Sequence, residues 1–327
     1  MQYGRVATLA AAVTLALGAM NSASAAEPDH DFNCDSVHFG QPNWTGVSIK
    51  TDTATWMLEQ IGYDTETTSA SLPIVYQAMT DQEIHVLLAQ WMPSQREQYR
   101  EYGIDGALDV VSPNLVGGRY TVAVPDYVYE AGVTSLEDLD DHKEQFGGEI
   151  FGIEPGSGGN DTIEKMIEDD YAGLGDWDLV ASSEPGMLSE VSKRERDGEW
   201  IAFLGWAPHP MNINHDMEYL AGGAEYWGPN KGEVIVNTVT PTGYAWACSN
   251  MGQFLDNYNW TVEEQSLAMG YVSNDDMDPL EAGKKVIREN PHMIERWFRQ
   301  SGIYQTGEIK AADGSEAEDL VREALGL

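Results

Sequence analysis

The segment IAFLGWAPHPMN, residues 201–212, ends a strand in an unusual way. Five residues of buried-strand character lead into Trp206, and two prolines then flank His209. A simple turn could use Gly, Asn or Asp instead. The segment LLAQWMPSQ at 87–95 repeats the pattern, with an apolar run, Trp91, one residue and a proline. A large indole at the exit of two strands, each with a proline two residues later, indicates a role beyond turning the chain.

Short apolar strands alternate with helix-like segments on both sides of this stretch. Strands are predicted at 36–42, 83–91, 119–125, 149–155 and 201–206, and helices at 53–64, 135–146, 161–171 and 186–198. The helix at 135–146 opens with a capping-box pattern at Ser135. The segment 232–248 is β-rich, and the chain after it is mostly helical. Strands separated by helices of this length predict an α/β fold with a parallel sheet.

The first 25 residues have the pattern of a secretory signal peptide. Arg5 precedes an apolar stretch at 6–20, and Ala23-Ser24-Ala25 follows as a small-residue cleavage site. The remaining chain has no apolar run long enough to span a bilayer. We therefore expect an exported, periplasmic protein that begins near Ala26.

The chain after the leader has two cysteines, Cys34 and Cys248. In an oxidising compartment each has one possible partner, so one disulfide is expected between them. It would join the start of the chain to a distant segment, as a discontinuous domain requires. About 300 residues usually form two domains. We predict one lobe at 26–118 plus 238–327 and a second at 119–237, with the chain crossing near 117–124 and 232–242.

The charge balance is strongly acidic. The chain has 18 Lys and Arg residues against 54 Asp and Glu, a net charge of −36 that becomes −37 once the leader is removed. Such a field excludes nucleic acids and anionic membrane surfaces as partners. Because the acidic residues are scattered through normal apolar periodicity, they indicate a solvated surface adapted to high salt rather than disorder, with attraction for cations as the alternative.

The aromatic residues at strand ends predict a binding site. Ligands of open α/β sheets bind beyond the carboxyl ends of the strands, so Trp91 and Trp206 would face one cleft from opposite lobes. Trp44 follows the first strand, and Tyr120 lies at a crossing. Aromatic faces suit a quaternary ammonium group, which donates no hydrogen bonds. The other patterned tryptophans, Trp56, Trp246 and Trp297, are expected in the core.

The loop GIEPGSGGNDTIEKM at 152–166 lacks the Gly-Lys-Ser/Thr of a nucleotide-binding loop. Asp161 and Glu164 fit a capping box, and the free N–H groups of residues 157–160 could also hold a carboxylate. His209 could contact a ligand or bond only to the turn.

Neither a metal site nor a catalytic site is predicted. The histidines have no metal-ligand spacing, and the chain has no recognisable nucleophile motif. The rival class, a periplasmic hydrolase acting on a small cation, would need a nucleophile and a base beside Trp91 and Trp206. We therefore expect no enzyme activity and no cofactor.

Five motifs together resemble one protein family, in order and through nearly the whole chain. They are NWTGV (43–47), QWMPS (90–94), GRYTVAVP (118–125), GIEPGSGGN (152–160) and FLGWAPHPMN (203–212). They resemble the substrate-binding proteins of ABC importers for glycine betaine, proline betaine and choline, nearest to the choline-binding branch. The resemblance implies a type II periplasmic binding fold, two lobes joined by two crossover strands that close over a ligand. It also implies delivery of the ligand to an inner-membrane permease, and a monomer is the default expectation.

The resemblance also implies roles for particular residues. The aromatic box would be Trp44, Trp91, Tyr120 and Trp206, and Cys34 and Cys248 would form the disulfide of the choline-binding branch. Ser157 or Asn160 would supply a polar contact. With their neighbours, the candidate ligand-binding residues are Trp44, Gly46, Val47, Trp91, Tyr120, Ser157, Asn160, Trp206 and His209.

One position departs from the choline-binding pattern. Those proteins carry an aspartate that accepts a hydrogen bond from the choline hydroxyl, where this chain has Gly46. We therefore predict a zwitterion as the ligand, glycine betaine first, with proline betaine or carnitine as further possibilities. A choline-specific protein of the same transporter class is the alternative, and presentation of the ligand to a chemoreceptor is another. The surface charge favours a role in osmoprotection over catabolism.

Overall fold

The computed structural model describes residues 32–103, 106–299 and 309–327. The predicted leader lies outside these residues. Within them, no helix is both long enough and apolar enough to cross a bilayer.

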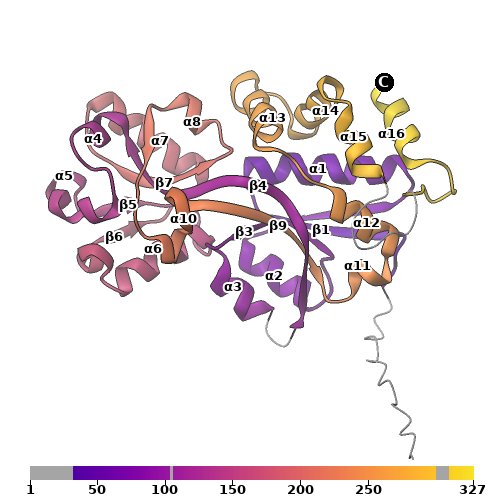
Figure 1. Ribbon diagram of the computed structural model, residues 1–327, viewed down its shortest axis with the longest axis horizontal. Helices are drawn as coiled ribbons and strands as arrows, with labels where there is room; N and C mark the ends of the chain where they lie inside the picture. The colour runs from indigo at the N-terminus through magenta and orange to yellow at the C-terminus, as the bar shows by residue number, and fades with distance from the viewer. Residues whose placement is uncertain (1–31, 104–105, 300–308) are drawn as a thin grey trace, which may run out of the picture.

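A mixed sheet of nine strands runs through the whole molecule (Figure 1). The strand order is β2-β1-β3-β9-β4-β7-β5-β6, with β8 paired to β4. The strands are β1 (Ser36–Gln41), β2 (Asp64–Ser69), β3 (Val86–Met92), β4 (Leu108–Pro125), β5 (Glu149–Phe151), β6 (Asp178–Val180), β7 (Ala202–Ala207), β8 (Met217–Tyr219) and β9 (Glu233–Pro241). The β1–β2, β1–β3, β5–β6 and β5–β7 pairs are parallel, as the alternation of strands and helices predicts.

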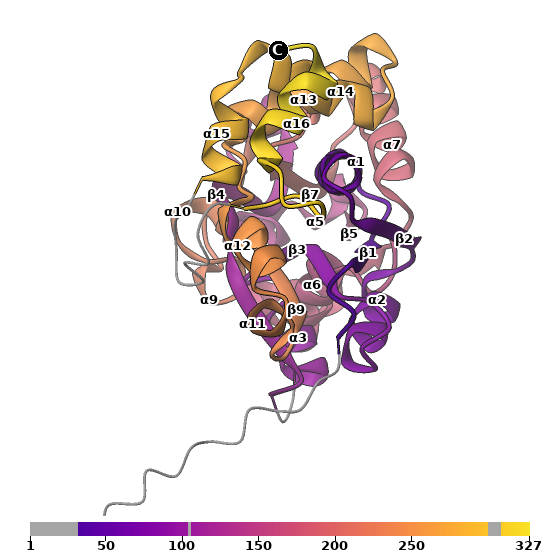
Figure 2. The same cartoon turned by 90° about the vertical axis from the view of Figure 1, so that its right-hand side faces the viewer.

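Helices cover this sheet on both sides. In the first lobe, α1 and α13 to α16 lie on one face and α2 and α3 on the other (Figures 1 and 2). The helices are α1 (Thr45–Gln60), α2 (Leu72–Thr80), α3 (Arg96–Tyr102), α4 (Asp126–Glu130), α5 (Lys143–Phe146), α6 (Gly158–Glu168), α7 (Glu184–Asp197), α8 (Met211–Asn214), α9 (Ala224–Trp227), α10 (Pro229–Gly232), α11 (Tyr244–Ala247), α12 (Ser249–Asn257), α13 (Val262–Asp275), α14 (Pro279–Glu289), α15 (His292–Phe298) and α16 (Ala317–Leu325).

Two long strands connect the lobes. β4 and β9 pair antiparallel from Leu108 opposite Pro241 to Arg119 opposite Glu233, and Figure 1 shows them running together from one lobe to the other. They lie where the two crossings were predicted. The buried apolar side chains of 115–236 pack in one cluster together with Trp91, whereas the other buried apolar side chains of the first lobe form two further clusters. The exact lobe boundaries remain a prediction that these clusters support.

Some predicted elements differ in extent from those observed. The helix predicted at 53–64 begins at Thr45, because Val47 and Ile49 already belong to its buried face although polar residues separate them from the later apolar positions. The helix predicted at 135–146 consists of two 3-10 turns and the short α5. Its capping box is confirmed, formed by Ser135 and Asp138. Trp246 is 59% exposed rather than in the core, whereas Trp297 is fully buried.

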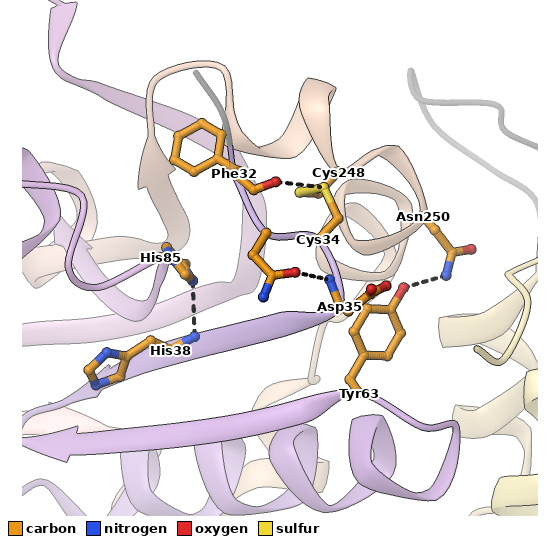
Figure 3. The surroundings of a disulfide bond; sticks show 9 residues. Phe32, Cys34, Asp35, His38, Tyr63, His85, Cys248 and Asn250 are labelled. Carbon is orange, nitrogen blue, oxygen red and sulfur yellow. Dashed lines mark hydrogen bonds between the residues drawn. A yellow bond between two sulfur atoms is a disulfide. The ribbon is translucent and has the colours of Figure 1, made fainter. Parts of the chain in front are cut away.

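The predicted disulfide between Cys34 and Cys248 is present (Figure 3). It joins residues 214 positions apart and links the chain preceding β1 to the junction of α11 and α12. The second cysteine therefore follows a helical turn rather than the end of a strand. Nearby, Asn250 donates to the Tyr63 hydroxyl at 2.6 Å, a second link between the early and late parts of the first lobe.

Candidate functional site

Three of the predicted aromatic rings meet where the strands of the two lobes adjoin. Trp91 lies near the end of β3, Tyr120 on β4 and Trp206 near the end of β7. Tyr120 and Trp206 are directly opposite in the antiparallel pairing of β4 and β7. The Tyr120 ring lies 5.8 Å from each indole, centroid to centroid, in edge-to-face geometry. Each of the three side chains is less than one-tenth exposed.

Trp44 brings a fourth ring from the first lobe, to which Trp91 also belongs. It is the N-cap residue of α1 and packs against apolar clusters of both lobes. Its indole Nε1 donates to Glu154 Oε1 of the second lobe at 2.5 Å. The four rings share one cavity, with an empty volume of about 520 Å³ that includes its opening to solvent. The other lining residues are Gly46, Val47, Lys50, Gln95, Ile153, Gly158, Glu184, Pro208, Gln265 and Met269.

The repeated Trp-x-Pro pattern has the same local structure in both lobes. The Met92–Pro93 and Ala207–Pro208 peptide bonds are both cis. After each proline, a side chain donates to the tryptophan carbonyl: Ser94 Oγ to Trp91 at 3.1 Å, and Asn212 Nδ2 to Trp206 at 2.8 Å. The main chain of each tryptophan is therefore tied to the turn that follows it.

The glycine-rich loop supports the box from behind. Ser157 caps α6 by accepting from the Asn160 amide N–H, and the Asn160 side chain bonds to both the N–H and the carbonyl of Ile153. Neither residue is among those lining the cavity. Gly159 lies against Tyr120, since a Cβ built on it would stand 2.0 Å from the tyrosine hydroxyl. The glycine is needed for this close approach.

The capping box predicted at Asp161 is wrong, because α6 begins at Gly158 and is capped by Ser157. Asp161 instead accepts a hydrogen bond at 2.6 Å from Gln98 Nε2 of the first lobe. Gln98 Nε2 also donates to the Gly156 carbonyl at 2.8 Å. The glycine loop therefore helps to hold the lobes together.

His209 positions other residues of the site and does not line the cavity itself. Its Nδ1 accepts from the Met211 N–H at 3.0 Å, so the proton of the neutral ring is on Nε2. Nε2 then donates to Glu184 Oε1 at 3.1 Å. The same oxygen accepts from the Thr45 hydroxyl of the first lobe at 2.7 Å. The imidazole also packs against the Trp206 indole, with 4.9 Å between ring centroids.

Sequence reasoning missed Lys50, Glu184, Gln265 and Met269. Gln265 and Met269 are four residues apart on α13 and so share a face, but nothing in the sequence relates that face to the box. Lys50 lies one turn beyond Gly46 on α1 and donates to Asn114 Oδ1 at 2.7 Å. Burial lowers the pKa of Lys50 to about 7.

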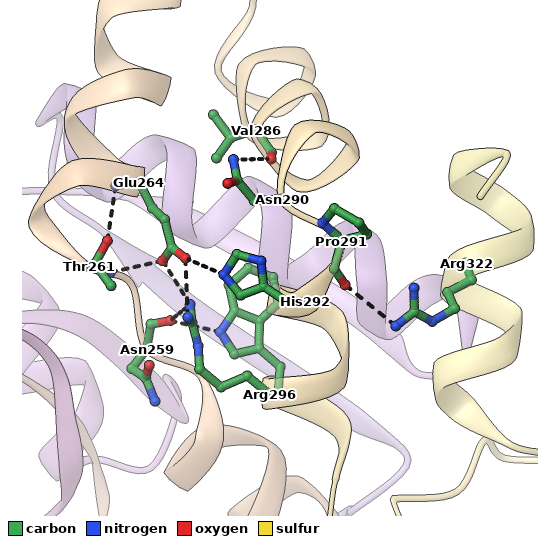
Figure 4. Close-up of polar contacts among 10 residues, drawn as sticks. Asn259, Thr261, Glu264, Val286, Asn290, Pro291, His292, Arg296 and Arg322 are labelled. Atoms are coloured by element: carbon green, nitrogen blue, oxygen red, sulfur yellow. Dashed lines mark hydrogen bonds and ion pairs between the residues drawn. The ribbon is translucent and has the colours of Figure 1, made fainter.

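A polar network fixes the start of α13. Thr261 and Glu264 form a capping box, and Arg296 donates to both carboxylate oxygens of Glu264, at 2.7 and 3.1 Å (Figure 4). His292 lies 3.6 Å from the same carboxylate. This network sets the position of the next residue, Gln265, in the cavity wall.

Negative charges surround the box. Burial, followed by the charges of Glu154, Asp161 and Glu184, raises the pKa of Tyr120 well above its usual range. The phenol is therefore neutral, and its ring faces a region rich in carboxylates. Among the described residues, no group of three or more His, Cys, Asp or Glu side chains could hold a metal ion.

Comparisons with known proteins identify the family of this chain. Residues 35–289 match the family of the substrate-binding domain of ABC-type glycine betaine transport systems. A choline-binding protein of an ABC transporter, solved with choline, is 36% identical with a TM-score of 0.84, covering 90% of this chain and 99% of its own. The lactococcal glycine betaine complex of OpuAC is 27% identical with a TM-score of 0.72, covering 80% of this chain and 99% of its own.

A curated relative gives the same assignment. The glycine betaine/carnitine transport binding protein GbuC of Listeria monocytogenes is 31% identical over 186 residues, 56% of this chain and 58% of that protein. The chain thus spans little more than half of the Listeria protein. The family match is broader, since it covers most of the described residues and all four rings of the box. This chain therefore belongs to the substrate-binding proteins of ABC-type glycine betaine and choline transporters, which work outside the cytoplasm with a membrane permease.

Proposed function

We propose that this protein captures a small quaternary ammonium solute between Trp44, Trp91, Tyr120 and Trp206 and delivers it to the permease. The observation that carries the proposal is the convergence of these four rings, from both lobes, on one cavity. A trimethylammonium group offers no hydrogen-bond donor, whereas each aromatic face attracts its diffuse charge by roughly 0.5–2 kcal/mol. The carboxylates of Glu154 and Glu184 add to this attraction.

Hydrogen bonds across the cleft support capture by lobe closure. Trp44 bonds to Glu154, Thr45 to Glu184, and Gln98 to the glycine loop, each joining the first lobe to the second. A ligand enclosed in this way is released only when these contacts open, which couples binding to presentation at the permease.

The biological setting follows from the charge and the leader. We propose that residues 1–25 direct export and are removed, and that the protein acts as a monomer. A net charge of −36, or −37 without residues 1–25, suits a protein that works in high salt, where quaternary ammonium compounds serve as compatible solutes. Osmoprotection is therefore the proposed role of uptake.

The test is calorimetric titration of the exported chain with choline and with glycine betaine. We expect the wild type to bind at least one of the two solutes. Trp206→Ala should lower the affinity for that solute by about tenfold or more, because a ring and its buried area are removed. Trp206→Phe should retain most of the affinity. Trp246→Ala, which removes an exposed tryptophan outside the cavity, is the matched control. A folded protein that binds neither solute, or a Trp206→Ala variant with unchanged affinity, would overturn the proposal.

A further inference from the structure

We infer that Glu184 selects the ligand by its tail: the cavity takes a cation that carries a hydrogen-bond donor, such as a hydroxyl, in preference to a zwitterion that carries a carboxylate. The inference rests on the proposed function and specifies the substrate class of the same site.

Glu184 has one occupied and one unoccupied carboxylate oxygen. Oε1 accepts from the Thr45 hydroxyl at 2.7 Å and from His209 Nε2 at 3.1 Å. Oε2 is buried, and no described residue bonds to it. The whole residue is 6% exposed and lines the same cavity as the four rings. A buried carboxylate oxygen without a partner is costly, so a ligand that donates to it gains that energy on binding.

The carboxylate is held rigidly in this position. Ser183 caps α7 by accepting from the Gly186 N–H, and Pro185 follows Glu184 in the first turn. His209 bonds to Oε1 from the second lobe and Thr45 from the first. Since Thr45 adjoins Gly46, the acceptor stands at the N-terminus of α1, and this arrangement is completed only when the lobes close.

The chemistry of the neighbouring groups supports the same selection. A carboxylate can only accept, whereas the amide of Gln265, which also lines the cavity, can turn either a donor or an acceptor toward a ligand. A carboxylate tail beside Glu184 would place two negative charges together. Lys50 is the cationic residue among those lining the cavity, but it already donates to Asn114, and its lowered pKa leaves it only partly charged near neutral pH.

The experiment compares choline, glycine betaine and tetramethylammonium by calorimetry, at one high salt concentration, on the wild-type chain and on Glu184→Gln. We expect the wild type to prefer choline to betaine by at least about tenfold. Glu184→Gln should weaken choline by about 10- to 100-fold, the usual range for a hydrogen bond to a charged group. It should leave betaine unchanged or strengthen it, and should affect tetramethylammonium, which has no tail, much less than choline.

Two control variants distinguish a change in ligand preference from a general loss of binding. Thr45→Val removes the cross-cleft bond but keeps the carboxylate, so it should weaken choline and betaine alike. Glu190→Gln makes the same chemical change on the same helix at a residue outside the cavity, where Glu190 pairs with Lys193 and Arg194, and it should leave the affinity for both ligands unchanged. A wild type that prefers betaine, or a Glu184→Gln variant that loses both ligands equally, would overturn the inference while leaving the proposed function standing. A folded wild type that binds neither ligand would overturn both.

Discussion

Replacing Gly159 by alanine tests whether Tyr120 is fixed where the structure places it. A Cβ on residue 159 would lie 2.0 Å from the Tyr120 hydroxyl oxygen, 2.5 Å from its Cζ and 2.9 Å from Leu204 Cδ1. Ordinary contacts are about 3.5 Å, so the ring would have to move by more than about 1 Å. Its edge-to-face contacts with Trp91, Trp206 and Trp227, all between 5.7 and 5.8 Å, leave no such movement without disturbing the box.

The expected cost has two parts. Overpacking of a buried site typically lowers the free energy of unfolding by about 1–3 kcal/mol, and Gly159→Ala should fall in this range. Losing the contribution of one ring, about 0.5–2 kcal/mol, should also raise the Kd of the quaternary ammonium ligand by about 2- to 30-fold. Both effects arise from the same single methyl group.

Gly270→Ala is the matched control, since Gly270 also lies in a helix but no described atom outside its own helix backbone comes within 4 Å of an added Cβ. It should raise the free energy of unfolding by about 0.5–1 kcal/mol and leave binding unchanged. Denaturant unfolding and calorimetric titration of both variants measure the two quantities. If Gly159→Ala binds and unfolds like the wild type, Tyr120 is not held against α6 as described, and the geometry of the box is incorrect.

Three further predictions concern stability. Burial, helped by a nearby acidic side chain, raises the pKa of Asp52 from 3.8 to about 6, so its ionisation destabilises the fold as the pH rises through this range. Asp52→Asn should therefore raise the free energy of unfolding by about 1 kcal/mol at pH 8, a value that allows for solvent screening, and should not raise it at pH 3. Equal changes in the free energy of unfolding at both pH values would contradict this. Thr261→Ala should cost about 1 kcal/mol through loss of the α13 cap, whereas Thr261→Ser should restore it in urea unfolding. Replacing Cys34 and Cys248 together by serine should lower stability by about 2–5 kcal/mol because a loop of more than 200 residues is no longer closed, and an unchanged melting temperature would show that the disulfide does not contribute.

Much of the fold was predictable because its signals are local. The strands at β1, β3, β7 and β9 are short apolar runs, and two cysteines in an exported chain have one possible pairing. The box was predictable in part because the same Trp-x-Pro pattern occurs twice. The start of α1 was not, since Trp44 at its N-cap makes no side-chain capping bond that a sequence motif could reveal.

The polar part of the site could not be predicted, because its contacts join distant segments. Thr45 and Glu184 are 139 residues apart, and nothing distinguishes Glu184 from the other acidic residues of the chain. The preference for a betaine was predicted from Gly46, which forms one wall of the cavity, and it stays a prediction that the ligand titrations test. In the structure, Gln265 Nε2 would lie 2.4 Å from a Cβ at position 46, so the glycine makes room for a residue of α13.

This packing also changes how position 46 should be tested. Gly46→Asp alone would push against Gln265 and combine a change of charge with a clash. The double variant Gly46→Asp/Gln265→Ala, compared with Gln265→Ala, isolates the effect of the added carboxylate on the choline-to-betaine ratio.

The central claim is that the box recognises a positive charge and not merely a bulky apolar group. The most direct measurement is calorimetric titration of choline against 3,3-dimethylbutan-1-ol, and of glycine betaine against 3,3-dimethylbutanoate, in which carbon replaces the charged nitrogen without change of shape. We predict that each carbon analogue binds at least about 30-fold more weakly than its ammonium counterpart, since several aromatic faces each contribute about 0.5–2 kcal/mol. Equal affinity within both pairs would contradict the account.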